Sequence, residues 1–116
     1  VTAGNKVDAD IAGDLAMNDD SLIQATAGDV EITANNAYLD NSSDIDAANN
    51  AVLGITNDLI MSQTDGDATI NAGNTADIDA DNVTMNNSSL ITADTADIDA
   101  GTDIIMNDSS KIDAVT

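Results

Sequence analysis

The chain repeats itself, most clearly in its last third. Residues 82–93 read Asn-Val-Thr-Met-Asn-Asn-Ser-Ser-Leu-Ile-Thr-Ala, and residues 103–114 read Asp-Ile-Ile-Met-Asn-Asp-Ser-Ser-Lys-Ile-Asp-Ala. Met85 and Met106 mark one period of 21 residues. A fixed period of about 20 to 50 residues is typical of solenoids and related arrays, in which each repeat packs on the next. The repeat therefore constrains the fold more than any other feature.

Three short apolar patterns recur within each repeat, and each alternates inward and outward residues as a β-strand does. The methionine pattern occupies residues 15–17, 37–39, 59–61, 83–85 and 104–106. The Ile-x-Ala pattern occupies residues 23–25, 45–47, 70–72, 91–93 and 112–114. A third pattern, with isoleucine at its end, occupies residues 30–32, 53–55, 76–78 and 96–98.

These spacings predict an all-β fold, a parallel β-helix or β-solenoid with three strands per coil, 21–25 residues per coil and about five coils. We expect it to be right-handed, because the hexapeptide pattern of left-handed β-helices is absent. The outer two residues of each methionine triplet should point inward. They predict a core column formed by Met17, Leu39, Met61, Met85 and Met106.

Polar corners join the predicted strands. Gly, Asn and Asp, which tolerate left-handed backbone conformations, stand at residues 13–14, 35–36, 57–58, 81–82 and 101–103. The corner after each methionine pattern predicts a ladder of side chains that hydrogen-bond from coil to coil. Its members are Asn18, Asp40, Ser62, Asn86 and Asn107. The third coil is longer by about three residues at this corner, so Asp65, Gly66 and Asp67 should protrude as a loop able to bind a partner.

The charge of the chain excludes several functions. It has 22 acidic residues, two lysines, no arginine and no histidine, and its formal charge is −20. Nucleic-acid grooves need clustered Lys and Arg, and anionic membranes attract basic segments, so we expect no nucleic-acid partner and no membrane insertion. Disorder is an alternative for so acidic a chain. However, 42% of the residues are hydrophobic, and they are regularly spaced.

Catalysis has few of its usual groups here, because His, Cys and Arg are all absent. Carboxylate pairs can hydrolyse glycosidic bonds, but in a chain this rich in aspartate such pairs arise by chance. We therefore expect no enzymatic activity. A β-helical carbohydrate-active enzyme is the alternative, and it would need a cleft lined by carboxylates and sugar-stacking aromatics. The only aromatic residue is Tyr38.

No cofactor is required by the predicted fold, but calcium is an option. The repeat places Asp77 and Asp97 in one outward column, and Asp79 and Asp99 in the next. Like charges on neighbouring strands repel each other, and a hard cation bound by carboxylate oxygens would relieve the repulsion. No EF-hand loop or glycine-rich calcium repeat is present. A solvated acidic face is the alternative interpretation of these four residues.

An apolar stripe is expected on the outside of the methionine pattern. Its middle residues point outward, and three of them are large and apolar: Tyr38, Ile60 and Ile105. Contiguous exposed apolar area often marks an interaction surface. This stripe is a candidate surface on which another rod, or a long loop, would pack.

The Gly/Asn-Asp turns, the Val/Ile-x-Met-Asn pattern and the Ser-x-Ile-x-Ala pattern together resemble the β-helical repeats of filamentous-haemagglutinin-like adhesins, the large exoproteins of two-partner secretion. The resemblance covers nearly the whole chain and rests on repeat style and period. It implies a right-handed, three-faced β-helix, export across the outer membrane, and a location outside the cell or at the cell surface.

We therefore expect residues 1–116 to be a single solenoid segment of a longer repetitive protein, uncapped at both ends. Its expected role is a structural or adhesive part of a fibre, in adhesion or in a biofilm matrix. The partners would be further coils or other copies in the fibre, and a host or matrix receptor. A Ca²⁺-dependent binding module on an acidic solenoid is the alternative function.

Overall fold

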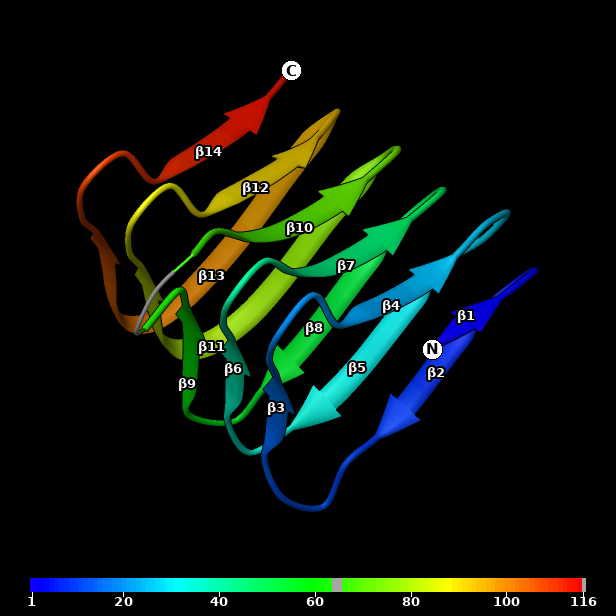
Figure 1. The fold of residues 1–116 in the computed structure, drawn as a ribbon, viewed down its shortest axis with the longest axis horizontal. Coiled ribbons are helices and arrows are strands. Elements are labelled where there is room, and N and C mark those ends of the chain that lie inside the picture. The colour runs from blue at the N-terminus through cyan, green and yellow to red at the C-terminus, as the bar shows by residue number, and fades with distance from the viewer. Residues whose placement is uncertain (64–65, 116) are drawn as a thin grey trace.

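The structure, a computed structural model, describes residues 1–63 and 66–115. The chain folds as a parallel β-solenoid of about five coils (Figure 1). Across these two ranges the secondary structure consists of strands without a helix, and paired strands run parallel. The predicted fold class, an all-β parallel β-helix built from three strands per coil, is confirmed.

Each coil passes through three faces, which we name after their most typical residues. The alanine face consists of β1 (Thr2–Ala3), β4 (Leu22–Ala25), β7 (Ser43–Ala47), β10 (Ala68–Ala72), β12 (Leu90–Ala93) and β14 (Lys111–Ala114). The acidic face consists of β2 (Val7–Asp10), β5 (Val30–Ala34), β8 (Ala51–Ile55) and the first parts of β11 (Thr75–Met85) and β13 (Thr95–Met106). The methionine face consists of β3 (Leu15–Met17), β6 (Ala37–Leu39), β9 (Asp58–Met61) and the last parts of β11 and β13.

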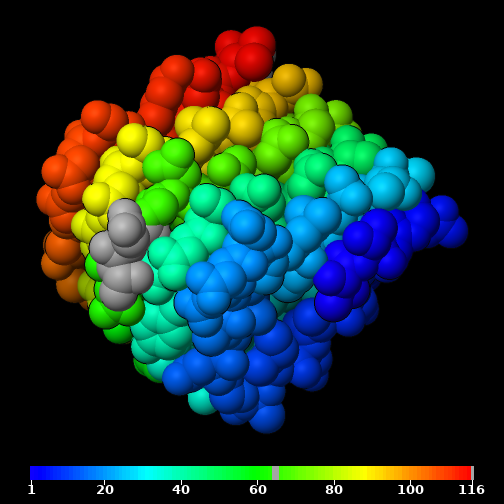
Figure 2. All heavy atoms as spheres, in the orientation of Figure 1, coloured from blue at the N-terminus to red at the C-terminus, as the bar shows by residue number. Residues whose placement is uncertain are grey.

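Successive coils lie side by side along one axis. On the alanine face the order in space, β1-β4-β7-β10-β12-β14, is also the order in the chain. Figure 2 shows the coils as successive bands from the N-terminal to the C-terminal end. Neighbouring parallel strands need a long connection, and the rest of the coil supplies it. Because β11 bends through a corner and pairs with both β8 and β9, the acidic and methionine faces form one sheet.

Inward side chains stack into columns that form a narrow core. The strand register aligns in one column the residues of the predicted core column, Met17, Leu39, Met61, Met85 and Met106. The first four of these residues are at most 4% exposed, whereas Met106, in the last coil, is 43% exposed. Burying each such side chain stabilises the fold by roughly 1.5–3 kcal/mol. Small alanines at other inward positions let the three faces close around this interior without large aromatic residues.

Coil length varies because extra residues are accommodated at corners. Equivalent alanines of the alanine face are 22 positions apart between Ala25 and Ala47, but 25 apart between Ala47 and Ala72. The extra residues follow Met61, as predicted from the sequence. Of the expected loop, Asp65 lies outside the described residues and Asp67 is exposed. Gly66 lies against the preceding coil, where a Cβ added to it would be 3.0 Å from the Cα of Asn41.

Two glycines allow the closest approach between coils. A Cβ added to Gly28 would lie 1.7 Å from the backbone oxygen of Asn5, and one added to Gly73 would lie 2.1 Å from that of Ala48. Both glycines stand at the corner between the alanine and acidic faces. Their missing side chains therefore let the backbone of one coil rest directly on the next.

We predict that Gly28→Ala destabilises the fold by about 1–3 kcal/mol, because the new methyl group forces two coils apart. Urea unfolding followed by circular dichroism would measure the loss. Gly13→Ala is the matched control, since nothing lies within 4 Å of its added Cβ. The control should be neutral or slightly stabilising. Equal losses in the two variants would contradict close coil contact at Gly28.

Candidate functional site

Outward side chains stack in columns just as inward ones do. Neighbouring parallel strands are about 4.8 Å apart, so each outward carboxylate has a neighbour in the coil before and after it. Two carboxylates in adjacent positions repel, whereas an amide or hydroxyl next to a carboxylate donates a hydrogen bond. The residues before and after each aspartate in its column therefore determine whether its carboxylate is repelled or hydrogen-bonded.

The corner before the methionine face carries an alternating ladder of aspartate and asparagine. Asn36 Nδ2 donates to Asp14 Oδ1 at 2.8 Å, and Asn82 Nδ2 donates to Asp58 Oδ1 at 2.8 Å. The backbone N–H of Asp58 donates to Asn36 Oδ1 at 3.2 Å, which links the two pairs. The register places Asp103 next to Asn82 in the following coil. Because an asparagine stands between each two aspartates, no two aspartates of this column lie in adjacent coils.

Other columns follow the same rule. On the alanine face, Gln24 Nε2 and Asn71 Nδ2 donate to the two oxygens of Asp46, at 2.8 and 3.0 Å. On the acidic face, Thr33 Oγ1 donates to Asp10 Oδ1 at 2.8 Å. Neutral hydrogen-bond donors from adjacent coils therefore stabilise several of the outward aspartates. Each such bond to a charged group contributes roughly 1.5–3 kcal/mol when well formed and less when exposed.

The residues predicted to form a side-chain ladder after the methionine pattern are linked from coil to coil mainly through their backbones. Backbone N–H groups of its last four members, Asp40, Ser62, Asn86 and Asn107, donate to carbonyls of the methionine column one coil earlier, at 2.7–3.0 Å. One side-chain rung joins two members, from Asn107 Nδ2 to Asn86 Oδ1 at 2.8 Å. The Ser62 hydroxyl instead donates to the backbone oxygen of Gly66. Asp40 and Ser62 are buried, whereas Asn18 and Asn107 are exposed.

Residues in the left-handed backbone conformation shape this corner. Asp19, Asn41, Asn87 and Asp108 have φ values between 51° and 57°. Asparagine and aspartate adopt this conformation more readily than other residues with side chains. The Asn/Asp content of the repeat is thus partly a backbone requirement rather than evidence of a binding site.

The acidic face begins with compensated charges. Asp8 and Glu31 stand opposite each other in β2 and β5, and Lys6 Nζ bridges them at 3.5 and 2.8 Å. The hydrogen bond to Glu31 raises the pKa of Lys6 above its ordinary value. The only other lysine, Lys111, pairs with Asp113 at 2.8 Å within its own strand.

The acidic face ends with carboxylates that face each other. The register of β11 and β13 pairs Asp77 with Asp97 and Asp79 with Asp99, as the repeat predicts. All four side chains are exposed. Two unit charges 4 Å apart repel by about 1 kcal/mol in water. The repulsion is not offset by a lysine, because both lysines lie elsewhere. This part of the surface is therefore the most strongly anionic part of the face.

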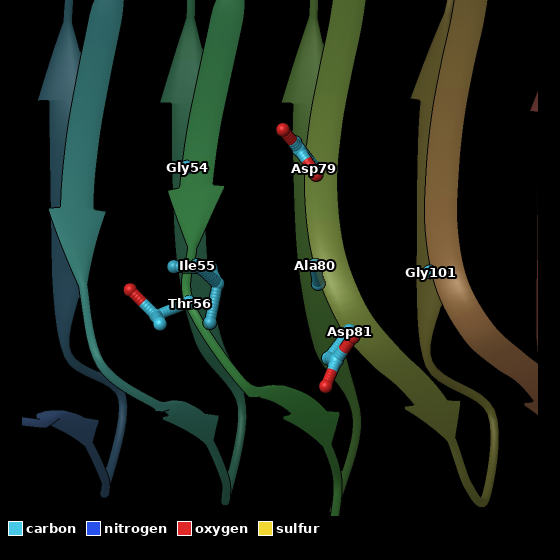
Figure 3. A pocket seen from close by; sticks show the side chains of 7 residues that line it. All are labelled: Gly54, Ile55, Thr56, Asp79, Ala80, Asp81 and Gly101. Atoms are coloured by element: carbon cyan, nitrogen blue, oxygen red, sulfur yellow. The ribbon is translucent and has the colours of Figure 1, made fainter.

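A shallow depression adjoins one of these carboxylates, Asp79 (Figure 3). Gly54 stands in the same column as Asp79, one coil earlier, and leaves its place without a side chain. The resulting space, of about 340 Å³, is lined by Thr56, Asp79, Asp81 and Gly101 among others. In residues 1–63 and 66–115, no group of three or more carboxylates is arranged to hold a metal ion. The predicted calcium ligands thus form two pairs rather than one cluster.

The predicted apolar stripe lies in one column of the methionine face. The register stacks Tyr38 on Ile60, and the column continues through Thr84 to Ile105. Tyr38 and Ile60 are half-buried, and Ile105 is 45% exposed. Thr84 interrupts the apolar run. The residues of the stripe are therefore neighbours in successive coils, and the aspartate–asparagine ladder runs along one side of the stripe.

Comparison of the chain with protein-family models, curated proteins and solved structures gives no match. Throughout the described part of the chain, no helix has the length and apolarity needed to cross a membrane.

We predict that Asn36→Asp destabilises the protein at low salt by about 1–3 kcal/mol, because it places three carboxylates in a row and removes a donor. The loss should shrink as NaCl screens the charges. Thermal unfolding in low and molar NaCl would measure both effects. Asn49→Asp adds the same charge at an exposed corner position between Gly28 and Asn74. An equal loss in that control would attribute the effect to net charge rather than to the ladder.

Removing charge from the facing aspartates should have the opposite effect. We predict that the double variant Asp77→Asn, Asp79→Asn gains about 1–2 kcal/mol of stability at low salt, and that molar NaCl removes most of this gain. Asp44→Asn is the control, because its column neighbours, Leu22 and Thr69, carry no charge. A gain that persists in molar NaCl would show that repulsion between coils is not its cause.

Proposed function

We propose that this chain is a structural, non-catalytic segment of an extracellular or cell-surface fibre, which serves adhesion or a filament or biofilm matrix. The observation that carries the proposal is the unbroken stacking of parallel strands along one axis. On the alanine face this stacking runs through all six strands from β1 to β14. Backbone hydrogen bonds in such a stack run along the axis of the rod, so a pulling force is shared among many of them.

The repeat pattern supports the same proposal. It resembles filamentous-haemagglutinin-like adhesins in its corners and in its Val/Ile-x-Met-Asn and Ser-x-Ile-x-Ala patterns. A parallel β-solenoid of about five coils is compatible with a β-helical repeat protein of that kind. On this proposal the chain is exported, and its partners are further coils or copies in the fibre and a receptor on a host cell or matrix.

The composition supports a role that involves neither catalysis nor nucleic-acid binding. The chain has no His, Cys or Arg and a net charge of −20, so it offers neither an imidazole or thiol for catalysis nor a basic groove. A high charge of one sign also keeps an elongated protein soluble when many copies are secreted.

Immunogold electron microscopy tests this proposal. Antibodies raised against residues 1–116 should label intact, unpermeabilised cells of the source organism, along filaments or in the surrounding matrix. Fab fragments of these antibodies should reduce attachment of the cells to their substrate, whereas Fab fragments against an internal protein should not. Labelling that appears only after permeabilisation would contradict an extracellular fibre.

A Ca²⁺-dependent binding module is the second candidate function. The in-register pairs Asp77–Asp97 and Asp79–Asp99 favour it, because a hard cation shared by facing carboxylates relieves their repulsion. Millimolar Ca²⁺ should then raise the melting temperature more than Mg²⁺, or NaCl at the same ionic strength. The Asp77→Asn, Asp79→Asn variant should lose the extra rise in melting temperature that Ca²⁺ gives over the other two salts. Equal rises with the three salts would contradict a Ca²⁺ site and attribute the effect to charge screening.

A further inference from the structure

The alanine face has a depression of its own, separate from the facing aspartates. It has a volume of about 410 Å³ and lies over β4, β7 and β10. Small-ligand sites commonly have volumes of roughly 300–1,000 Å³. Two outward columns border the depression. One contains Leu22, Asp44 and Thr69, and the other contains Gln24, Asp46 and Asn71.

One border is a fixed polar network. Asp46 accepts hydrogen bonds on both carboxylate oxygens, from Gln24 Nε2 at 2.8 Å and from Asn71 Nδ2 at 3.0 Å. These bonds hold three planar side chains in place across three coils. Each amide keeps its carbonyl oxygen and a second N–H for another partner. Groups that are already ordered lose less entropy when a ligand binds.

The other border combines two polar side chains with one exposed apolar side chain. The Asp44 carboxylate and the Thr69 hydroxyl stand next to each other in register, and neither makes a side-chain hydrogen bond within residues 1–63 and 66–115. Leu22, next to Asp44 in the preceding coil, is 37% exposed. The depression therefore offers donors, acceptors and an apolar surface within one small area.

This combination selects a class of ligand. The charge of −20 repels anions, so an acidic ligand is disfavoured. Hydroxyl groups donate and accept at once, which suits neighbouring amides, a carboxylate and a threonine. The C–H face of a sugar ring would pack on Leu22. We propose that the depression over β4, β7 and β10 binds a neutral saccharide. This inference rests on the adhesive function proposed above and names the chemistry of its receptor.

An amide NMR titration of the whole chain tests the proposal. The probes are the methyl glycosides of glucose, galactose and mannose, and N-acetylglucosamine. At least one should give saturable shifts at residues 22–24, 44–46 and 69–71, with a millimolar Kd. N-acetylneuraminic acid, which is anionic, should give none. The absence of saturable shifts with every neutral probe, or shifts centred on another face, would overturn the proposal. A response to spermidine alone would also overturn it, because the site would then recognise cations.

Matched variants locate the site. Thr69→Val keeps the shape of the side chain and removes its hydroxyl, and Asp44→Asn removes the charge and replaces one acceptor oxygen with an NH₂ donor. Each should weaken binding of the responding sugar by roughly five- to tenfold, the effect of losing one hydrogen bond. Thr84→Val, on the methionine face, is the control and should leave binding unchanged. Equal binding by all variants would overturn the assignment. Surface labelling of cells remains an independent readout, so failure of sugar binding and failure of the fibre proposal are distinguishable.

Discussion

The structure depends on how a stack of coils accommodates carboxylates in outward columns, whose positions repeat about every 4.8 Å along its axis. Two carboxylates at that spacing repel each other. Sliding one strand along the next would separate them, but it would also break the alignment of the inward side chains in the core. The chain meets this constraint mainly with neutral donors. Asn36 and Asn82 separate aspartates at one corner, and Gln24 and Asn71 hold Asp46 on the alanine face. Only two lysines are available for ion pairs.

The same stacking determines the interior. Because every inward residue meets its counterpart in the next coil, side chains of similar size must follow each other along a column. The row from Met17 to Met85 satisfies this with Met and Leu alone, and the tightest corners use Gly28 and Gly73. Differences in coil length lie at corners, for example after Met61 and around Gly101, where β13 carries a bulge relative to β11. The faces therefore stay regular enough to present continuous surfaces.

Much of this could be predicted from the sequence, because a solenoid converts sequence period directly into spatial neighbours. The fold class, the methionine column, the Asp77–Asp97 and Asp79–Asp99 pairs and the stripe through Tyr38 and Ile60 all follow from period alone. The period alone does not reveal the alternating ladder of Asp14, Asn36, Asp58, Asn82 and Asp103, although its members are spaced like the methionines. Because Asn and Asp have high turn propensity, these residues predict only turns. Recognising it required the side-chain bonds, as did the polar network around Asp46.

Native-state amide hydrogen exchange tests the central claim, coil-on-coil stacking, most directly. In a parallel stack the strands of inner coils pair on both sides, as β7 and β8 do, whereas β1 and β14 each pair on one side. The account predicts slow exchange for β5, β7, β8 and β10, with protection falling toward both ends of the stack. Asn36→Asp should then weaken protection most in the coils that contain Asp14 and Asp58. Uniformly fast exchange, or protection unrelated to position in the stack, would contradict the account.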